Sequence, residues 1–333
     1  MTATTARTTV LVTSRSFSTG ARDLVSELAA AGLDVVRGPA THDLDVLRAP
    51  LAIAAAWIAG AGPVTAAHLA AAPRLRVVAR YGVGVDAVDL AAAAACGVVV
   101  THTPGANTDA VADHAVTLLL AVLRGVVAGD RGVRTGDWTV RRGRELGALT
   151  LGVVGFGRIG QGLARRLTGF GTAVFAHDPY VTDDAIRSLG ARPATLEELA
   201  ERCDAVSLHA PGGRRVVDAA WLERARPGMV LVNTARADLV DEGAVAAALR
   251  SDRLGGYAAD TLGTETTGAV SLLLADDLAD RVVITPHIGA QTVEAIDRMG
   301  AAATADVRAA LSGARPAHPV HMISTTKHNQ EEQ

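Results

Sequence analysis

The chain contains 333 residues, of which 31 are arginine and only one, Lys327 in the C-terminal tail, is lysine. Schiff-base enzymes need a lysine amine in the active site, and a P-loop needs a lysine beside the phosphates. The composition therefore argues against pyridoxal phosphate enzymes, lysine-type aldolases and Walker-A nucleotidases. A net charge of −3 gives no reason to expect a nucleic acid or a membrane surface as partner.

Length and residue usage predict a globular protein of about two domains. The two cysteines, Cys96 and Cys203, fall in separate expected elements, so neither a disulfide framework nor a metal site is expected. No apolar run reaches the roughly 18 residues of a membrane span, and the N-terminus lacks the apolar core of a signal peptide. We therefore expect a cytoplasmic protein.

Strand-like and helix-like patterns alternate in the first hundred residues. Helices are expected at 21–31, which stops at Gly32, and at 86–95. The expected strands are 8–13, 76–79 and 98–100. This alternation predicts a mostly parallel sheet.

One long helix is expected at Asp109–Leu123, with Asn107 or Thr108 as its N-cap. Apolar residues occupy nearly all of its sides. We therefore expect the helix to be buried on more than one side, by another domain or by a second subunit.

The alternation restarts at Leu149 with a stronger pattern. The expected strands are 149–154, 173–177, 205–209, 229–233, 257–259 and 282–285, and the expected helices are 158–170, 195–203, 219–223 and 242–250. This order predicts a second doubly wound unit. A further helix is expected at 294–311, followed by a mobile tail at 321–333.

A dinucleotide fingerprint, Gly155-Phe-Gly157-Arg-Ile-Gly160, lies between an expected strand and an expected helix. The first glycine permits a tight turn, the second lets the backbone approach a pyrophosphate, and the third lets helix and strand pack closely. The helix N-terminus offers N–H groups to the phosphates, and Arg158 adds a positive charge.

Asp178 ends the next expected strand, 18 positions after Gly160. A carboxylate at this place accepts hydrogen bonds from the adenosine ribose and repels a 2′-phosphate. The sequence therefore predicts NAD rather than NADP as cofactor.

Three residues with acid–base or anion-binding chemistry follow strands of the second unit: Arg236, Glu265 and His287. Open α/β sheets bind ligands at these carboxyl ends. An arginine can hold a carboxylate through two hydrogen bonds, a histidine can exchange a proton, and a glutamate can orient that histidine. Spacing alone leaves open that Arg236 is a solvated or capping residue, His287 a structural one and Glu265 an exposed one.

From about Val10 to about Val320 the chain resembles the D-isomer-specific 2-hydroxyacid dehydrogenase family. The matching stretches are Arg80-Tyr-Gly-Val-Gly-Val-Asp86, Pro104-Gly-Ala-Asn-Thr108, Gly155–Gly160 with Asp178, Leu208-His-Ala-Pro211, Val232-Asn-Thr-Ala-Arg236, Val240-Asp-Glu242 and Thr285-Pro-His-Ile-Gly289. The resemblance implies that Arg236 binds and polarises a 2-oxo acid. It also implies that His287 is the general acid/base and that Glu265 is its partner.

The resemblance further assigns residues to the cofactor and the substrate. It implies that Asp260 contacts the nicotinamide end and that the Val83–Gly84 backbone faces the substrate carboxylate, with Arg80 beside them. The expected cofactor-binding residues are Gly155, Gly157, Arg158, Ile159, Gly160, Asp178, His209, Ala210, Pro211, Thr234, Ala235, Asp260 and Gly289. No metal is expected.

The fold implied by the family is α/β with two doubly wound parallel-sheet domains. A Rossmann domain, residues 104–289, is inserted into a flavodoxin-like substrate domain made of residues 1–103 and 290–320. The cleft is expected to close on hinges near Thr103 and Gly289, and Asp109–Leu123 is expected to form a homodimer contact.

The chain departs from the family pattern at three places. Arg236-Ala-Asp238 replaces Arg-Gly-Gly, a shortened Gly212–Arg215 replaces a Leu-Thr-Pro-x-Thr loop, and Asp260-Thr-Leu-Gly-Thr-Glu265-Thr266 lacks the usual aromatic residue and proline. The second phosphate-binding arginine of phosphoglycerate dehydrogenases falls at about Ala59, and no regulatory domain is expected after the tail. These differences do not favour 3-phosphoglycerate, although Arg80, Arg214 and Arg215 keep a second anionic group open.

We therefore predict an NAD-dependent D-2-hydroxyacid dehydrogenase, or equivalently a 2-oxoacid reductase. A phosphite- or phosphonate-type dehydrogenase is an alternative, opposed by the Gly-Val-Gly-Val-Asp86 loop. A non-catalytic, NAD-sensing scaffold like the corepressors of the family is another. The absence of a basic patch and of an obvious peptide-docking extension opposes this scaffold.

Overall fold

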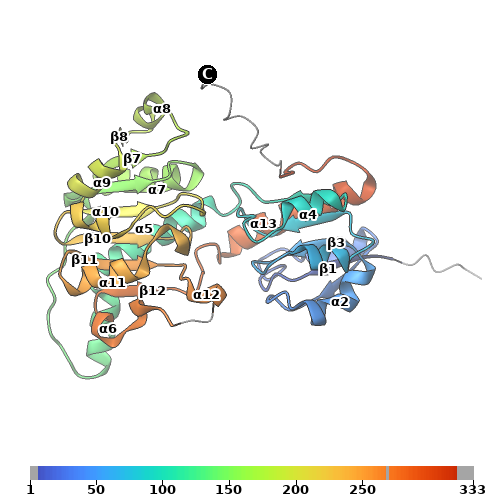
Figure 1. The fold of residues 1–333 in the computed structure, drawn as a ribbon, viewed down its shortest axis with the longest axis horizontal. Helices are drawn as coiled ribbons and strands as arrows, with labels where there is room; N and C mark the ends of the chain where they lie inside the picture. Colours follow the sequence, from blue (N-terminus) through green and yellow to red (C-terminus); the bar gives the residue numbers. More distant parts are fainter. Residues whose placement is uncertain (1–6, 268–269, 321–333) are drawn as a thin grey trace, which may run out of the picture. The chain divides into compact units, whose positions relative to one another are not determined.

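The computed structural model describes residues 7–267 and 270–320, and the chain forms two compact units (Figure 1). The first unit comprises Met1–Asn107 and Gln291–Gln333, and the second is the continuous segment Thr108–Ala290. The predicted tail at 321–333 lies outside the described residues.

The first unit contains a five-stranded sheet in the order β2-β1-β3-β4-β5, with every neighbouring pair parallel. Its strands are β1 Thr8–Val12, β2 Leu33–Arg37, β3 Ala54–Ala59, β4 Val77–Arg80 and β5 Val99–Thr101. Its helices are α1 Leu24–Ala30, α2 Leu44–Ile53, α3 Ala66–Ala70, α4 Leu90–Ala95 and α13 Val293–Ser312. Strands β2 and β3 and helices α2 and α3 were not predicted from the sequence. Pro50 lies inside α2 and interrupts its helical pattern, and β3 begins with an alanine run, which is not typical of strands.

The C-terminal segment completes the first unit. Helix α13 packs against β3 and β4, and the chain then returns so that Pro319 pairs antiparallel with Thr101 of β5. The buried carboxylate of Asp306 accepts a hydrogen bond from the backbone N–H of Ala317 at 2.7 Å. These contacts explain why residues after 290 group with the N-terminal part of the chain.

The second unit contains a seven-stranded parallel sheet in the order β12-β11-β10-β9-β6-β7-β8. Its strands are β6 Thr150–Val154, β7 Ala173–His177, β8 Arg192–Pro193, β9 Ala205–Leu208, β10 Met229–Asn233, β11 Leu254–Ala259 and β12 Val282–Ile284. Its helices are α5 Thr108–Leu123, α6 Val126–Arg134, α7 Arg158–Thr168, α8 Asp183–Ser188, α9 Leu196–Arg202, α10 Ala219–Arg224, α11 Glu242–Arg250 and α12 Thr264–Thr267. The strand order reverses at β6, where such sheets bind ligands. The predicted fold class, two parallel-sheet α/β units, is confirmed.

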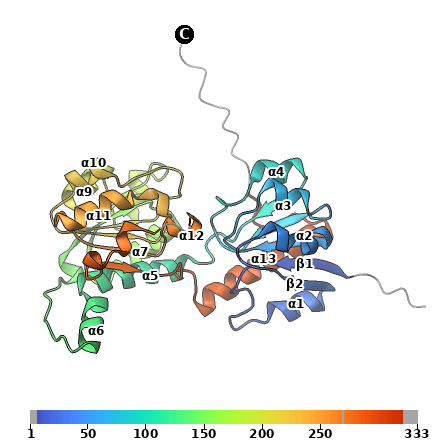
Figure 2. The ribbon, with the colours of Figure 1, turned by 60° about the horizontal axis from the view of Figure 1, so that its bottom comes forward.

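Helix α5 is buried within its own unit, which differs from our expectation. It packs against α7 and against β10, β11 and β12 (Figure 2). Leu118 and Leu119 are fully covered. Packing in the second unit therefore accounts for the buried apolar residues of α5, while Val116, Leu120 and Val122 stay partly exposed.

No single helix in the described ranges, 7–267 and 270–320, is long and apolar enough to cross a membrane. The pair α5 and α6 meets the length and hydropathy of a span when joined, but the two helices bend by 59° between them.

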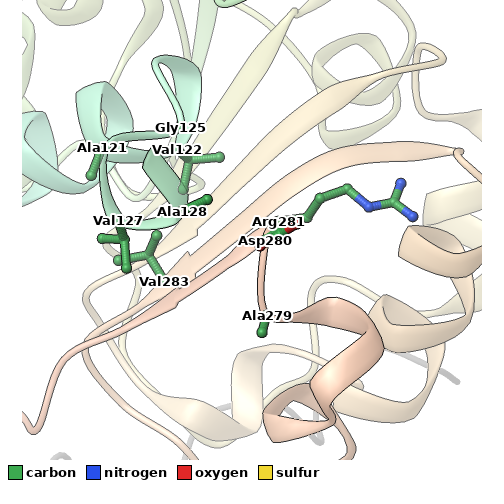
Figure 3. Close-up of a pocket in the computed structure, with 9 residues that line it drawn as sticks. All are labelled: Ala121, Val122, Gly125, Val127, Ala128, Ala279, Asp280, Arg281 and Val283. Carbon is green, nitrogen blue, oxygen red and sulfur yellow. The ribbon is translucent and has the colours of Figure 1, made fainter. Parts of the chain in front are cut away.

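A small pocket lies where α5 meets α6, beside the chain that leads into β12 (Figure 3). Its volume of about 10 Å³ holds roughly one water molecule. Its lining residues are Ala121, Val122, Gly125, Val127, Ala128, Ala279, Asp280, Arg281 and Val283. None of the predicted site residues is among them, so this pocket does not serve as the candidate site.

Candidate active site

The glycine fingerprint forms a tight turn between β6 and α7. Gly155 has a φ of +87°, and a Cβ there would lie 2.6 Å from the Ala210 nitrogen. A Cβ on Gly160 would lie 2.2 Å from the Gly155 oxygen. Gly157, which precedes the first residue of α7, has open space at the same position. These surroundings match the predicted division of roles, with Gly157 leaving room for a pyrophosphate.

Asp178 follows β7 and faces the fingerprint turn. Its carboxylate accepts hydrogen bonds from the backbone N–H groups of Phe156 and Tyr180, both at 2.8 Å. A pocket of about 310 Å³ adjoins it, lined by Ala176, His177, Asp178, Asp183, Ile186, Pro193, Ala194, Thr195 and Glu198. Three of these residues are acidic, so this edge repels a 2′-phosphate.

The strands next to β6 supply the rest of the predicted cofactor rim. His209, Ala210 and Pro211 follow β9, while Thr234 and Ala235 follow β10. The Ser207 hydroxyl and a His209 ring nitrogen (Nε2) lie 2.9 Å apart, and burial lowers the pKa of His209 to about 4. His209 is therefore neutral near pH 7 and adds no charge to the rim.

Arg236 stands directly beyond Ala235, and its position is fixed by the backbone around it. Its Nη1 donates to the Ala235 carbonyl at 2.9 Å. The side chain of Asn233 donates to the Arg236 carbonyl at 2.8 Å and accepts from the Ala235 N–H at 3.0 Å. Sequence analysis gave Asn233 no role, although it lies inside the quoted Val-Asn-Thr-Ala-Arg motif.

His287 and Glu265 form the predicted pair, with 2.9 Å between Nδ1 and Oε2. Glu265 is itself held, because its other oxygen accepts from the Leu262 N–H at 3.0 Å. The hydrogen bond from Glu265 raises the pKa of His287, and this effect outweighs burial and the nearby charge of Arg236. The carboxylate can only accept, so Nδ1 carries a hydrogen and Nε2 is left for proton exchange.

The backbone of His287 is strained, with a φ of +54°. A left-handed non-glycine residue carries roughly 1–3 kcal/mol of strain and is held there only by its surroundings. The following residues provide that support, since the N–H groups of Ile288 and Gly289 donate to Asp260 at 2.8 and 2.7 Å.

Asp260 is the centre of a buried network that sequence analysis only partly foresaw. Its Oδ1 accepts from the Thr285 hydroxyl at 2.5 Å and lies 3.3 Å from the Nε2 of His114 on α5. Burial acts to raise the pKa of Asp260, but its hydrogen bonds with His114, Thr285, Ile288 and Gly289 outweigh burial and lower it. His114 was missed because its only hint in the sequence is a polar residue within an apolar helix.

Arg80, Val83 and Gly84 lie in the first unit, at and just after the end of β4. Arg80 Nη1 donates to the Tyr81 carbonyl at 2.9 Å. The carbonyl of Gly82 accepts from the Thr103 N–H at 2.9 Å, and that of Val83 lies 3.0 Å from the His102 ring nitrogen. In a trans peptide the N–H points opposite to the carbonyl, so the N–H groups of Val83 and Gly84 point away from residues 102–103.

The structure thus brings together the predicted residues of the second unit: the turn, the cofactor rim, Arg236 and the His287–Glu265 pair all follow strands of one sheet. The predicted substrate residues Arg80, Val83 and Gly84 belong to the first unit. Across the two described stretches of the chain, no group of three or more histidine, cysteine or acidic residues could hold a metal ion.

A parallel sheet with this turn and acid defines a dinucleotide-binding α/β protein. The family model described as "D-isomer specific 2-hydroxyacid dehydrogenase, NAD binding domain" matches residues 116–289. A D-3-phosphoglycerate dehydrogenase of Mycobacterium bovis is 41% identical over 295 residues, which are 86% of this chain and 55% of the relative. A glyoxylate reductase of Pyrococcus furiosus is 39% identical over 240 residues, covering 68% of this chain and 70% of that protein.

A crystal structure of a Thermus thermophilus protein is similar throughout, with a TM-score of 0.84 and 36% identity over 94% of this chain and 100% of that one. The chain therefore belongs to the D-isomer specific 2-hydroxyacid dehydrogenase family, as its motifs predicted, and its second unit holds the NAD-binding domain. It spans about half the length of the phosphoglycerate dehydrogenases that it matches.

Proposed function

We propose that this protein is an NAD-dependent D-2-hydroxyacid dehydrogenase that also runs as a 2-oxoacid reductase. The observation that carries the proposal is the His287–Glu265 pair, joined at 2.9 Å, at the same sheet edge as Arg236 and the glycine turn. NADH, when bound, supplies the hydride that adds to C2 of the 2-oxo acid, while the carbonyl oxygen takes up one proton. The products are the 2-hydroxy acid and NAD⁺.

His287 is the proton donor for reduction and the acceptor for oxidation. Its Nδ1–H is committed to Glu265, so the proton is exchanged at Nε2. The raised pKa of His287 keeps the imidazolium form populated near neutral pH, which suits donation to the developing alkoxide.

Arg236 binds the substrate carboxylate and polarises the neighbouring carbonyl. Its guanidinium presents a planar fork that matches a carboxylate, and the surrounding Asn233 and Ala235 contacts hold its backbone. In the first unit, which we assign as the substrate domain, the N–H groups of Val83 and Gly84 are assigned to substrate binding. Arg80 positions that loop through the Tyr81 carbonyl.

The cofactor is NAD rather than NADP. The carboxylate of Asp178 and the acidic pocket beside it oppose a 2′-phosphate. His209, Ala210, Pro211, Thr234, Ala235, Asp260 and Gly289 complete the cofactor site in this proposal.

A homodimer is part of the proposal, and the segment after α6 joins Asp109–Leu123 as a candidate for its contact. Helix α6 projects from the body of the second unit (Figure 2), and the segment after it exposes Trp138 by 77% and Val140 by 93%. Large apolar side chains at such exposure are typical of an interaction site. Analytical ultracentrifugation of the wild type and of Trp138→Ala with Val140→Ser tests it, since the double variant should be monomeric.

A substrate panel tests the activity. The purified protein is mixed with glyoxylate, pyruvate, hydroxypyruvate or phosphonopyruvate and either NADH or NADPH, and absorbance at the nicotinamide band is followed. NADH oxidation with a 2-oxo acid supports the proposal. NADH formation from NAD⁺ and phosphite supports a phosphorus-oxyacid dehydrogenase instead. Tight NADH binding without any turnover supports a non-catalytic NAD-sensing scaffold.

A further inference from the structure

The loop Gly212–Arg215 contacts the segment that follows Arg236. The loop comes directly after the cofactor rim, and Asp238 lies two residues after Arg236. The Gly213 N–H donates to the Asp238 carboxylate at 2.6 Å. A glycine at position 238 would leave that loop without this hydrogen bond.

The contact is the first of a row that joins the two segments. The N–H groups of Val216 and Val217 donate to the Leu239 carbonyl at 2.8 and 2.9 Å. The Asp241 N–H donates to the Val217 carbonyl at 2.8 Å, and the Asp241 carboxylate pairs with Arg215 at 3.0 Å. The loop is thereby fixed along the whole segment that begins with Arg236.

The same loop lies against the side chain of Arg236. A Cβ built on Gly212 would be 3.2 Å from Cγ of Arg236 and 2.9 Å from a carboxylate oxygen of Asp238. The space beside Gly212 is therefore only large enough for a hydrogen atom, and this loop limits the rotamers open to the Arg236 side chain, which would otherwise lose more conformational freedom on binding a ligand.

We propose that Asp238 is a positioning residue for Arg236. Its carboxylate holds the Gly212–Arg215 loop against the aliphatic part of the Arg236 side chain. The inference rests on the proposed function, in which the Arg236 guanidinium binds the carboxylate of a 2-oxo acid. A preorganised guanidinium binds that carboxylate more tightly, and a loosened one binds it more weakly without loss of the acid/base pair. Asp238 and the Gly212–Arg215 loop are then parts of one arrangement that positions the Arg236 side chain.

The test compares Asp238→Ala with Asp238→Asn, which keeps an oxygen acceptor for the Gly213 N–H. Asp238→Ala should raise the KM for the 2-oxo acid about 5- to 20-fold, because it removes the hydrogen bond that holds the loop, and the exposure of that hydrogen bond limits the effect. Its kcat should fall less than its KM rises, and the KM for NADH should stay within about twofold. Asp238→Asn should recover most of the wild-type KM.

Two further variants sharpen the test. Gly212→Ala places a methyl group against Arg236 and Asp238 and should raise the same KM while leaving residue 238 intact. Asp184→Ala, an exposed carboxylate on α8 that pairs with Arg187 at 3.0 Å, is the matched control and should behave as wild type.

Hydrogen–deuterium exchange of peptides covering residues 209–217 gives a readout that needs no activity. Faster exchange in Asp238→Ala, together with the raised KM, supports the inference. Faster exchange with an unchanged KM would overturn it and leave the proposed function standing. If the wild type turns over no 2-oxo acid, the proposed function fails and the positioning role fails with it, whatever the exchange shows.

Discussion

His42 in the first unit and His287 in the second have nearly the same backbone φ, but their pKa values are shifted in opposite directions. Both are left-handed, with φ of +56° and +54°, and both lie near the carboxyl ends of parallel strands. His42 is buried, and burial lowers its pKa to about 4. His287 is half exposed, and Glu265 raises its pKa.

The hydrogen bonds of His42 explain its inertness. Its Nδ1 lies 2.9 Å from the Pro63 carbonyl and therefore carries a hydrogen, so its Nε2 accepts from the Thr13 hydroxyl at 2.6 Å. That hydroxyl oxygen in turn accepts from Trp57 Nε1 at 2.9 Å. Both ring nitrogens of His42 are committed to the protein, whereas His287 commits only one. A free ring nitrogen and a carboxylate partner, more than residue type or backbone strain, distinguish His287 from His42.

The largest expected effect comes from His287→Ala. Loss of the proton donor should lower kcat by about 10² to 10⁴, because general acid–base groups typically contribute that much. The measurement is the steady-state rate of NADH oxidation with the best substrate of the panel. A variant that keeps most of its kcat would show that His287 is as structural as His42.

Arg236→Ala should raise the KM for the 2-oxo acid and lower kcat, each about 10- to 100-fold, since a hydrogen bond to a charged group is worth roughly 1.5–3 kcal/mol. The variant should bind NADH normally, which fluorescence titration checks. An unchanged KM would remove Arg236 from the substrate site.

His42→Ala should destabilise the first unit by about 2–4 kcal/mol, because it leaves a cavity in the core and removes the acceptor of the Thr13 hydroxyl hydrogen. The kcat of the folded protein should not change. Hydrogen exchange, measured separately for peptides of each unit, shows which unit loses stability. A uniform loss of protection in the second unit would contradict the prediction.

The stability of the first unit should depend on pH through His42. The pKa of His42 falls from 6.5 to about 4 on folding, so the unfolded chain binds more protons between these values. Stability of the first unit is therefore full above pH 6.5 and is lost as the pH falls toward 4, by about 3 kcal/mol at roughly 1.36 kcal/mol per pKa unit. Urea unfolding at a series of pH values measures the loss, which His42→Ala should flatten.

Glu265→Gln should give the smallest and most specific change. Because Glu265 raises the pKa of His287, its replacement should move the alkaline limb of kcat/KM for reduction to lower pH. This limb reflects loss of the proton from His287. A shift of the limb to higher pH, or no shift, would show that Glu265 does not raise the pKa of His287.

Local patterns made much of the second unit predictable. The bounds of β7, β10 and α11 match the prediction residue for residue, because clear turns and caps border each. The predicted helix at 195–203 also forms as α9, and a capping box with reciprocal hydrogen bonds between Thr195 and Glu198 begins it. Arg236, Glu265 and His287 were found because each follows a strand of the same sheet.

Contacts between distant segments were not predictable. His114 meets Asp260 and Thr285 only once α5 is packed on the sheet, and Asp238 meets Gly213 only once two loops lie together. No spacing in the sequence encodes these distances. In the first unit, β3 begins with three alanines, which favour helix over strand, so its strand conformation depends on packing rather than on local pattern.

The return of α13 to the N-terminal sheet has a consequence for synthesis. The second unit is one continuous segment, Thr108–Ala290, so all of its residues are translated before α13. The first unit still lacks the helix that packs on β3 and β4 and the chain that pairs with β5. On a ribosome we therefore expect the later-encoded unit to fold first and the N-terminal sheet to wait, partly uncovered, for the end of the chain.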